Sequence, residues 1–196
     1  MEHYYSERQK SPLNLKKIRQ KINGREFEFY TAAGIFSRNK IDMGTLVLTE
    51  NIAIGKNSKV LDIGCGIGVI GIAAAKFFDA SVVMSDINKR AVMLAKKNIE
   101  VNGIKAEILQ GNLYENIKQN DFDAVLSNPP QNAGKKLCFQ LIEESKKYLK
   151  NDGSFQLVAR HNKGGKSLSE KMKETFGNVK IIAKKAGYWV YLSVKE

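Results

Sequence analysis

Residues 60–71 have the sequence Val60-Leu61-Asp62-Ile63-Gly64-Cys65-Gly66-Ile67-Gly68-Val69-Ile70-Gly71. An apolar run passes through closely spaced glycines into a second apolar run, a pattern typical of a buried strand, a tight turn and a helix. Glycine adopts positive φ angles and has no side chain, so such a turn allows a large ligand to approach the backbone. The stretch therefore predicts the first strand of an α/β domain, with a binding site beside its turn.

The segments that follow alternate between strand-like and helical character. Strands are expected over residues 59–63, 81–86, 106–110, 122–127 and 153–159, and helices over 69–78, 89–102, 136–148 and 167–176. This alternation is the signature of a doubly wound, mostly parallel sheet. Two further strands, 179–184 and 188–194, are separated by a short turn and predict a terminal antiparallel hairpin.

The first 57 residues precede this core. We expect a basic helical stretch over residues 13–21, a strand over 26–31, a glycine turn at Gly34 and a helix that begins near Asp42. Repeats, low-complexity segments and a proline-rich linker are absent from the sequence. The simplest organisation is a single domain over residues 1–196, with a short N-terminal extension (1–57) and a cofactor-binding and catalytic core (58–196).

Two aspartates lie near the predicted glycine turn. Asp62 comes two residues before Gly64, and Asp86 ends the next strand. An acid at Asp62 repels a pyrophosphate, but it favours a cationic cofactor that bears an amino acid. The Asp86 carboxylate is placed to accept hydrogen bonds from both hydroxyls of a ribose, although an acid there would equally cap the helix that starts near Lys89.

A nicotinamide dinucleotide is the main alternative cofactor. Gly66-x-Gly68-x-x-Gly71 matches the dinucleotide fingerprint, and Asp86 lies 20 residues after Gly66, in range for a ribose-binding acid. This frame leaves Gly64 and Asp62 unexplained. Glycines that serve only a tight strand-helix connection are a second alternative.

Ser127-Asn128-Pro129-Pro130 follows the strand over residues 122–127, at the sheet edge where ligands bind. The Asn128 side-chain oxygen and the backbone carbonyl of Pro129 are placed to accept the two N–H groups of an exocyclic amine. That arrangement directs the nitrogen lone pair at a sulfonium methyl, and the two prolines stiffen the loop. An Asn-Pro pair is often only a rigid turn. Beside the glycine turn, however, it predicts that Asn128, Pro129 and Pro130 are catalytic and need no metal.

The net charge of +12 is concentrated in the two ends of the sequence. Residues 1–25 carry seven basic and two acidic side chains, and residues 135–196 carry fourteen and six. Residues 26–134 carry eleven and twelve. Basic ends around a near-neutral centre suit a polyanion such as RNA. The alternative is that lysine-rich faces only keep the protein soluble.

Composition argues against several other classes. No stretch approaches the roughly 20 apolar residues of a membrane helix, and the first residues have no secretion-signal pattern, so we expect a cytoplasmic protein without membrane attachment. Cys65, Cys138, His3 and His161 fall in no metal-ligand spacing. We therefore expect no metal site.

Together these motifs resemble class I S-adenosylmethionine methyltransferases with an Asn-Pro-Pro catalytic loop. Over almost the whole chain, the sequence is similar to the small-domain methyltransferase family that includes guanine-N2 enzymes of small-subunit ribosomal RNA, particularly its short archaeal stand-alone members. The matching segments are 3–7, 34–37, 42–45, 62–71, 86–88, 113–116, 128–130, 176–179 and 187–188.

The resemblance implies a seven-stranded, Rossmann-like methyltransferase sheet and a site for S-adenosyl-L-methionine. Its methionine part would lie over Gly64, Gly66 and Gly68, beside Asp62 and Asn128. Its ribose would lie at Asp86 and Ile87, and its adenine near Asn112 and Leu113.

Two positions depart from the family pattern. Asn112 replaces an acid that many members use for the adenine amino group, but its amide oxygen is still an acceptor. Gln131 replaces an aromatic residue that stacks on a flipped base in many Asn-Pro-Pro enzymes. Phe36 is a candidate for the missing stacking face, with a plain core role as its alternative, and Gln131 is a candidate reader of a base edge.

The sequence therefore predicts an enzyme that methylates an exocyclic amino group of an RNA base, with guanine-N2 of ribosomal RNA as the favoured acceptor. Adenine-N6 in nucleic acid and the amide of a protein glutamine are alternative acceptors, because each is a planar NH₂ group. A nonenzymatic RNA-binding module on the same fold is a third hypothesis, and it predicts damage at Asp62, Asp86 or Asn128. All three residues are intact.

Overall fold

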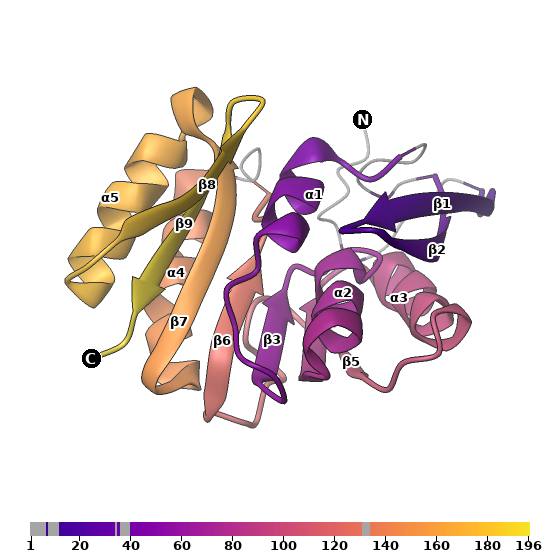
Figure 1. Cartoon of the computed structure of the whole chain (residues 1–196), viewed down its shortest axis with the longest axis horizontal. Helices are drawn as coiled ribbons and strands as arrows, with labels where there is room; N and C mark the ends of the chain where they lie inside the picture. The colour runs from indigo at the N-terminus through magenta and orange to yellow at the C-terminus, as the bar shows by residue number, and fades with distance from the viewer. Residues whose placement is uncertain (1–6, 8–11, 34, 36–39, 131–133) are drawn as a thin grey trace.

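The computed structural model describes residues 7, 12–33, 35, 40–130 and 134–196. Its centre is a seven-stranded sheet with the strand order β5-β4-β3-β6-β7-β9-β8 (Figure 1). The neighbours from β5 to β7 pair in parallel, whereas β9 pairs antiparallel with both β7 and β8. The strands are β3 (Lys59–Ile63), β4 (Ser81–Asp86), β5 (Glu107–Gln110), β6 (Phe122–Ser127), β7 (Leu149–Arg160), β8 (Lys180–Lys185) and β9 (Tyr188–Val194). The predicted α/β class, the seven strands and the terminal hairpin are confirmed.

Helices cover both faces of this sheet. One cluster of buried side chains joins the sheet to α1, α2 and α3, and a second joins its other face to α4 and α5. Alternation along β3 supplies both clusters, because Val60 belongs to the first and Leu61 and Ile63 belong to the second. The helices are α1 (Met43–Glu50), α2 (Val69–Phe78), α3 (Lys89–Val101), α4 (Lys135–Tyr148) and α5 (Gly165–Phe176). Among the described residues, none of the helices has the length and apolar character that spanning a membrane requires.

The N-terminal extension differs from the prediction in one element. The helix expected over residues 13–21 is wrong, because Lys16–Ile22 forms strand β1 and pairs antiparallel with β2 (Arg25–Thr31). The connection is Asn23-Gly24, with φ angles of 43° and 84°. Asn-Gly is the strongest signal for a two-residue hairpin, and the β1 side chains become buried with a period of two toward Ile22. The turn signal therefore outweighs the helical appearance of the basic residues.

Two asparagines on α3 attach this hairpin to the core. Asn98 accepts from the backbone N–H of Tyr30 at 2.6 Å and donates to its carbonyl at 3.1 Å. Asn102 makes the same pair of contacts with Glu28, at 3.3 and 2.7 Å. A four-residue step on a helix face matches a two-residue step along a strand. These bonds pair backbone N–H and C=O groups of β2 that would lack hydrogen-bond partners on an exposed sheet edge.

Helix α1 begins where the sequence indicated. Asp42 is its N-cap, and the carboxylate accepts from the backbone N–H of Thr45 at 3.1 Å. Figure 1 shows α1 starting at the end of the sheet to which the β3 and β6 arrows point. The cap therefore places Asp42 and Thr45 at the carboxyl edge of the sheet.

Candidate active site

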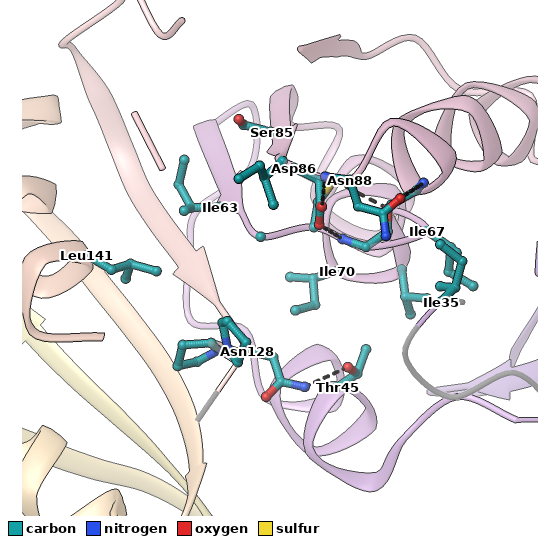
Figure 2. Close-up of a pocket in the computed structure, with 18 of the residues that line it drawn as sticks. Ile35, Thr45, Ile63, Ile67, Ile70, Ser85, Asp86, Asn88, Asn128 and Leu141 are labelled. Atoms are coloured by element: carbon teal, nitrogen blue, oxygen red, sulfur yellow. Dashed lines mark hydrogen bonds between the residues drawn. The ribbon is translucent and has the colours of Figure 1, made fainter. Parts of the chain in front are cut away.

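A pocket lies at this carboxyl edge, where parallel α/β sheets bind their ligands. Its walls come from α1, from the glycine turn after β3, from the ends of β4 and β5, from the segment after β6 and from α4. The predicted site residues that line it are Gly64, Gly66, Asp86, Ile87, Asn112, Leu113, Asn128, Pro129 and Pro130. Asp86 lies at one end and Asn128 at the other (Figure 2). Phe36 and Gln131 lie outside the described residues.

The glycines of the turn divide into two roles. Gly64 and Gly66 have φ angles of 68° and 55°, and a Cβ added to either would meet no atom within 4 Å. Both positions therefore need glycine for their backbone conformation, and both face open space on the pocket wall. Gly68 is not among the lining residues; its added Cβ would lie 3.2 Å from Met84 Sδ, so this glycine allows the start of α2 to pack against β4.

Asp86 fastens the glycine turn to the end of β4. Oδ2 accepts from the backbone N–H of Gly66 and Oδ1 from that of Asn88, both at 2.8 Å. Asn88, not Asp86, is the N-cap of α3, since its side chain accepts from the first backbone N–H groups of that helix. Burial is the main reason that the pKa of Asp86 is raised. Each carboxylate oxygen still has acceptor capacity for a ligand hydroxyl.

Asp62 lies behind the turn and is fully buried. One carboxylate oxygen accepts from the backbone N–H of Gly71 at 2.9 Å, and the other has no hydrogen-bond partner within the described structure. Burial raises the pKa of Asp62 to about 7; the Gly71 bond opposes this rise and the Asp86 charge adds to it. A buried acid with an unused oxygen is costly, and a nearby positive charge would relieve that cost.

Asn128 is oriented by the start of α1. Its Nδ2 donates to Thr45 Oγ1 at 2.9 Å and to Asp42 Oδ1 at 3.2 Å. The Thr45 hydroxyl donates its own proton to the Asp42 carboxylate. Asp42 and Thr45 therefore present only acceptors to Asn128, and the amide nitrogen must face them. Figure 2 shows this nitrogen directed at Thr45. The amide oxygen is therefore the acceptor that the group has left.

The loop after β5 forms another part of the wall. Leu113 has a φ angle of 50°, a conformation that residues other than glycine rarely adopt. Its carbonyl accepts from Ser85 Oγ at 3.3 Å, and the backbone N–H of Asn112 donates to Glu115 Oε2 at 3.2 Å. Such strained residues gather at ligand-binding loops, where the surrounding contacts enforce them. The two positions expected near adenine thus lie together on the pocket wall.

Several lining residues were missed by the sequence reasoning. Asp42 and Thr45 were predicted as a helix start and lie in a segment that matches the family, but their contact with Asn128 joins positions more than 80 residues apart. Cys65 lines the pocket and is buried, and burial raises the pKa of its thiol. The Asp-x-x-Thr cap was the only local signal in this set. Two further missed positions, Ser85 and Asn88, are polar, and several are apolar residues outside any motif: Ile35, Ile41, Leu137 and Leu141.

Comparison with known proteins adds an independent finding. A family model described as methyltransferase small domain matches residues 26–192. The uncharacterized protein YbxB of Bacillus subtilis (strain 168) is 35% identical over 198 residues, which cover 99% of this chain and 98% of that protein. Ribosomal RNA small subunit methyltransferase C of Hamiltonella defensa subsp. Acyrthosiphon pisum is 31% identical over 189 residues, which cover 94% of this chain and 55% of that protein.

The structure is also similar to a solved enzyme complex. The T. thermophilus 16S rRNA N2 G1207 methyltransferase, in complex with AdoMet and guanosine, matches with a TM-score of 0.83 and 25% sequence identity. The match covers 95% of this chain and 52% of that chain. The chain therefore spans nearly all of YbxB, but only about half the length of these two ribosomal RNA methyltransferases.

Proposed function

The chain belongs to the methyltransferase small domain family and is an S-adenosylmethionine-dependent methyltransferase, and from this premise we propose that it methylates the N2 amino group of guanine in ribosomal RNA. One observation carries the proposal. Asp42 and Thr45 bind the nitrogen of Asn128 and leave its oxygen as an acceptor, and Asn128 and the glycine turn line the same pocket. An amide oxygen oriented in this way is suited to an acceptor that bears an NH₂ group.

The relatives support the choice of acceptor. The Hamiltonella relative is named as a ribosomal RNA small subunit methyltransferase, and the T. thermophilus enzyme as one that acts on guanine N2 of 16S rRNA. This chain spans about half of each of these two enzymes, and we propose that it shares their substrate. The likeness to short archaeal stand-alone members stays a prediction.

The pocket has the features that S-adenosylmethionine requires. In this proposal its methionine part lies against Gly64 and Gly66, where an added Cβ would project into open space. Asp62 lies behind the turn and would become negatively charged as the cation of the cofactor binds, and Asp86 supplies carboxylate acceptors for the ribose. Asn112 and Leu113 face the adenine. When bound, the cofactor supplies an electrophilic methyl group on a positively charged sulfur.

Asn128 positions the amine that receives the methyl group. Its side-chain oxygen and the backbone carbonyl of Pro129 accept the two N–H groups, which draws the nitrogen toward tetrahedral geometry. A nitrogen–carbon bond forms as the carbon–sulfur bond breaks, and the amine then loses one proton to solvent. Pro129 and Pro130 fix the backbone, so the acceptors need little reorganisation during the reaction. Well-oriented groups can recover about 7 to 11 kcal/mol of a barrier.

The charge of this chain is the main reason to prefer an RNA base over the alternative acceptors. Adenine N6 and a glutamine amide offer the same planar NH₂ group, so Asn128 alone does not separate them. The two basic ends of the sequence favour a polyanion over a protein. The nonenzymatic alternative would require loss of a catalytic or cofactor-binding group, yet Asp62, Asp86 and Asn128 are all present.

Mass spectrometry of RNA nucleosides from cells with and without the gene tests this proposal. We expect one methylated guanosine in small-subunit ribosomal RNA to disappear when the gene is deleted and to return with the wild-type gene. Return of the mark with an Asn128→Ala gene would contradict the catalytic assignment. An unchanged set of RNA nucleosides, together with loss of a methylated glutamine, would move the activity to a protein.

A further inference from the structure

Two neighbouring segments at the carboxyl edge of the sheet form a basic surface outside the pocket. We propose that residues 160–166 and 184–189, here named the basic platform, bind the RNA backbone next to the target nucleotide. This inference rests on the proposed function, because it takes RNA as the substrate. It adds the place where that RNA docks.

The platform is one continuous surface. Arg160 pairs with Tyr188 in the register of β7 and β9, and the backbone N–H of His161 donates to the Gly187 carbonyl at 3.1 Å. Figure 1 shows the β8–β9 turn and the start of α5 at the same end of the molecule as the start of α1. The two segments contain no acid and five basic residues: Arg160, Lys163, Lys166, Lys184 and Lys185.

Aromatic rings contact several of these basic side chains. His161 stacks on Trp189 with ring centroids 3.5 Å apart and planes 11° apart, and Lys184 Nζ lies 4.1 Å from the Trp189 centroid. The guanidinium carbon of Arg160 lies 5.0 Å from the centroid of Tyr188. Single strands of nucleic acid bind to grooves that combine cations for phosphates with aromatic side chains near the bases. The platform has this composition.

Tyr188 connects the platform to the catalytic asparagine. A Cβ added to Gly44 would lie 2.9 Å from Tyr188 Cε1 and 3.1 Å from Asp42 Oδ1. Tyr188 thus packs against the same turn of α1 that orients Asn128. RNA bound on the platform would therefore have a nucleotide within reach of the pocket.

The other basic segment is a weaker candidate. On β1, both Lys17 and Arg19 form ion pairs with Glu28, at 2.7 and 3.1 Å, so part of their charge is already neutralised. On the platform, Lys185 pairs with Glu50 at 2.8 Å, and Glu170 lines a shallow hollow together with His161 and Lys166.

The test compares two triple variants with the same change of charge. The platform variant carries Arg160→Gln, Lys166→Gln and Lys184→Gln. The control carries Lys56→Gln, Lys105→Gln and Lys118→Gln, three exposed positions in the loops that precede β3, β5 and β6 at the opposite edge of the sheet. Purified total ribosomal RNA is the probe. Its binding is measured as a function of salt, and kcat/KM is measured for methyl transfer to it.

We expect the platform variant to bind this RNA more weakly. The slope of log binding constant against log salt concentration should become less steep by about 2 to 3, since each lost phosphate contact reduces it by about 0.7 to 0.9. Its kcat/KM should fall at least tenfold relative to the control, while S-adenosylmethionine affinity is unchanged in both. If the wild type methylates RNA and the platform variant keeps its RNA affinity and slope, this inference fails alone. A wild type that neither binds nor methylates RNA overturns the proposed function as well.

Discussion

Asn128 Nδ2 lies 3.2 Å from Asp42 Oδ1, so the loop after β6 is hydrogen-bonded to the N-cap of α1. The Asp42 carboxylate already accepts the backbone N–H and the hydroxyl of Thr45. The bond therefore ties the orientation of the candidate catalytic amide to the start of a helix in the N-terminal extension. Changes in that helix should alter the methylation step.

Replacing Thr45 tests this coupling. Thr45→Val keeps the shape of the side chain but removes the hydroxyl that accepts from Asn128, so only the Asp42 carboxylate still orients the amide nitrogen. A lost hydrogen bond of about 1 to 3 kcal/mol corresponds to a single-turnover methylation rate about 5- to 160-fold lower. Thr45→Ser keeps the hydroxyl and should retain most of the rate. Equal rates in the valine and serine variants would show that the hydroxyl does not position Asn128.

Two glycines with similar backbone conformations test the cofactor site. Gly66 and Gly103 have φ angles of 55° and 61°, and a Cβ added to either meets no atom within 4 Å. Alanine at either position should therefore cost a similar 1 to 2 kcal/mol or so of unfolding free energy. Only Gly66 lines the pocket, so only Gly66→Ala should also weaken S-adenosylmethionine binding in calorimetry. Equal cofactor affinities in the two variants would place the cofactor elsewhere.

Asp86→Ala should weaken cofactor binding because it removes the proposed acceptors of the ribose hydroxyls. The carboxylate accepts backbone N–H groups from Gly66 and Asn88, and we propose that it also accepts ribose hydroxyls. Each charge-assisted bond is worth about 1.5 to 3 kcal/mol, so affinity for S-adenosylhomocysteine should fall at least tenfold. Calorimetry of the folded variant measures this loss. Unchanged affinity would reduce Asp86 to a structural link between the turn and α3.

The raised pKa of Asp62 predicts a pH-dependent stability. Because burial raises this pKa from 3.8 to about 7, the folded chain keeps a proton on Asp62 that the unfolded chain has lost. The contribution of Asp62 to the free energy of unfolding should therefore fall as the pH rises from about 4 to 7, by about 1.4 kcal/mol per unit. Denaturant unfolding of the wild type and of Asp62→Asn at several pH values isolates this contribution. A constant difference between the two proteins across that range would contradict it.

The same group should couple cofactor binding to proton release. A cation bound beside the glycine turn favours the Asp62 carboxylate, so binding of S-adenosylmethionine at pH 6 should release a fraction of a proton. Calorimetry in buffers of different ionisation enthalpy detects that release. Asp62→Asn should abolish it.

The sequence was most informative where local pattern and tertiary environment agree. Strand β3 and helix α2 have the predicted bounds, because an apolar run, a glycine turn and a second apolar run allow few other structures. The prediction of a helix over residues 13–21 is wrong because the Asn23-Gly24 turn pairs this segment with β2 in a hairpin. Several pocket residues were predictable from strand ends, since parallel strands bring those ends together.

The partners of Asn128 were not predictable in the same way. Asp42 has a complete local role as a helix cap, and nothing in its neighbourhood along the chain indicates a second one. Leu113 adopts a positive φ angle. Such an angle can be predicted from sequence mainly at glycine, asparagine or aspartate, and not at leucine. Such positions depend on which loops meet at the sheet edge, which a local pattern does not encode.

The most direct test of the account is the single-turnover rate of the Asn128→Ala variant. Excess enzyme is mixed with deuterated-methyl S-adenosylmethionine and ribosomal RNA from cells that lack the gene, and labelled nucleosides are quantified over time by mass spectrometry. We predict N2-methylguanosine with the wild type and a rate lower by at least a hundredfold with Asn128→Ala, at unchanged RNA and cofactor affinity, because the oriented acceptor acts in the transition state. Labelling by Asn128→Ala at the wild-type rate would contradict the account.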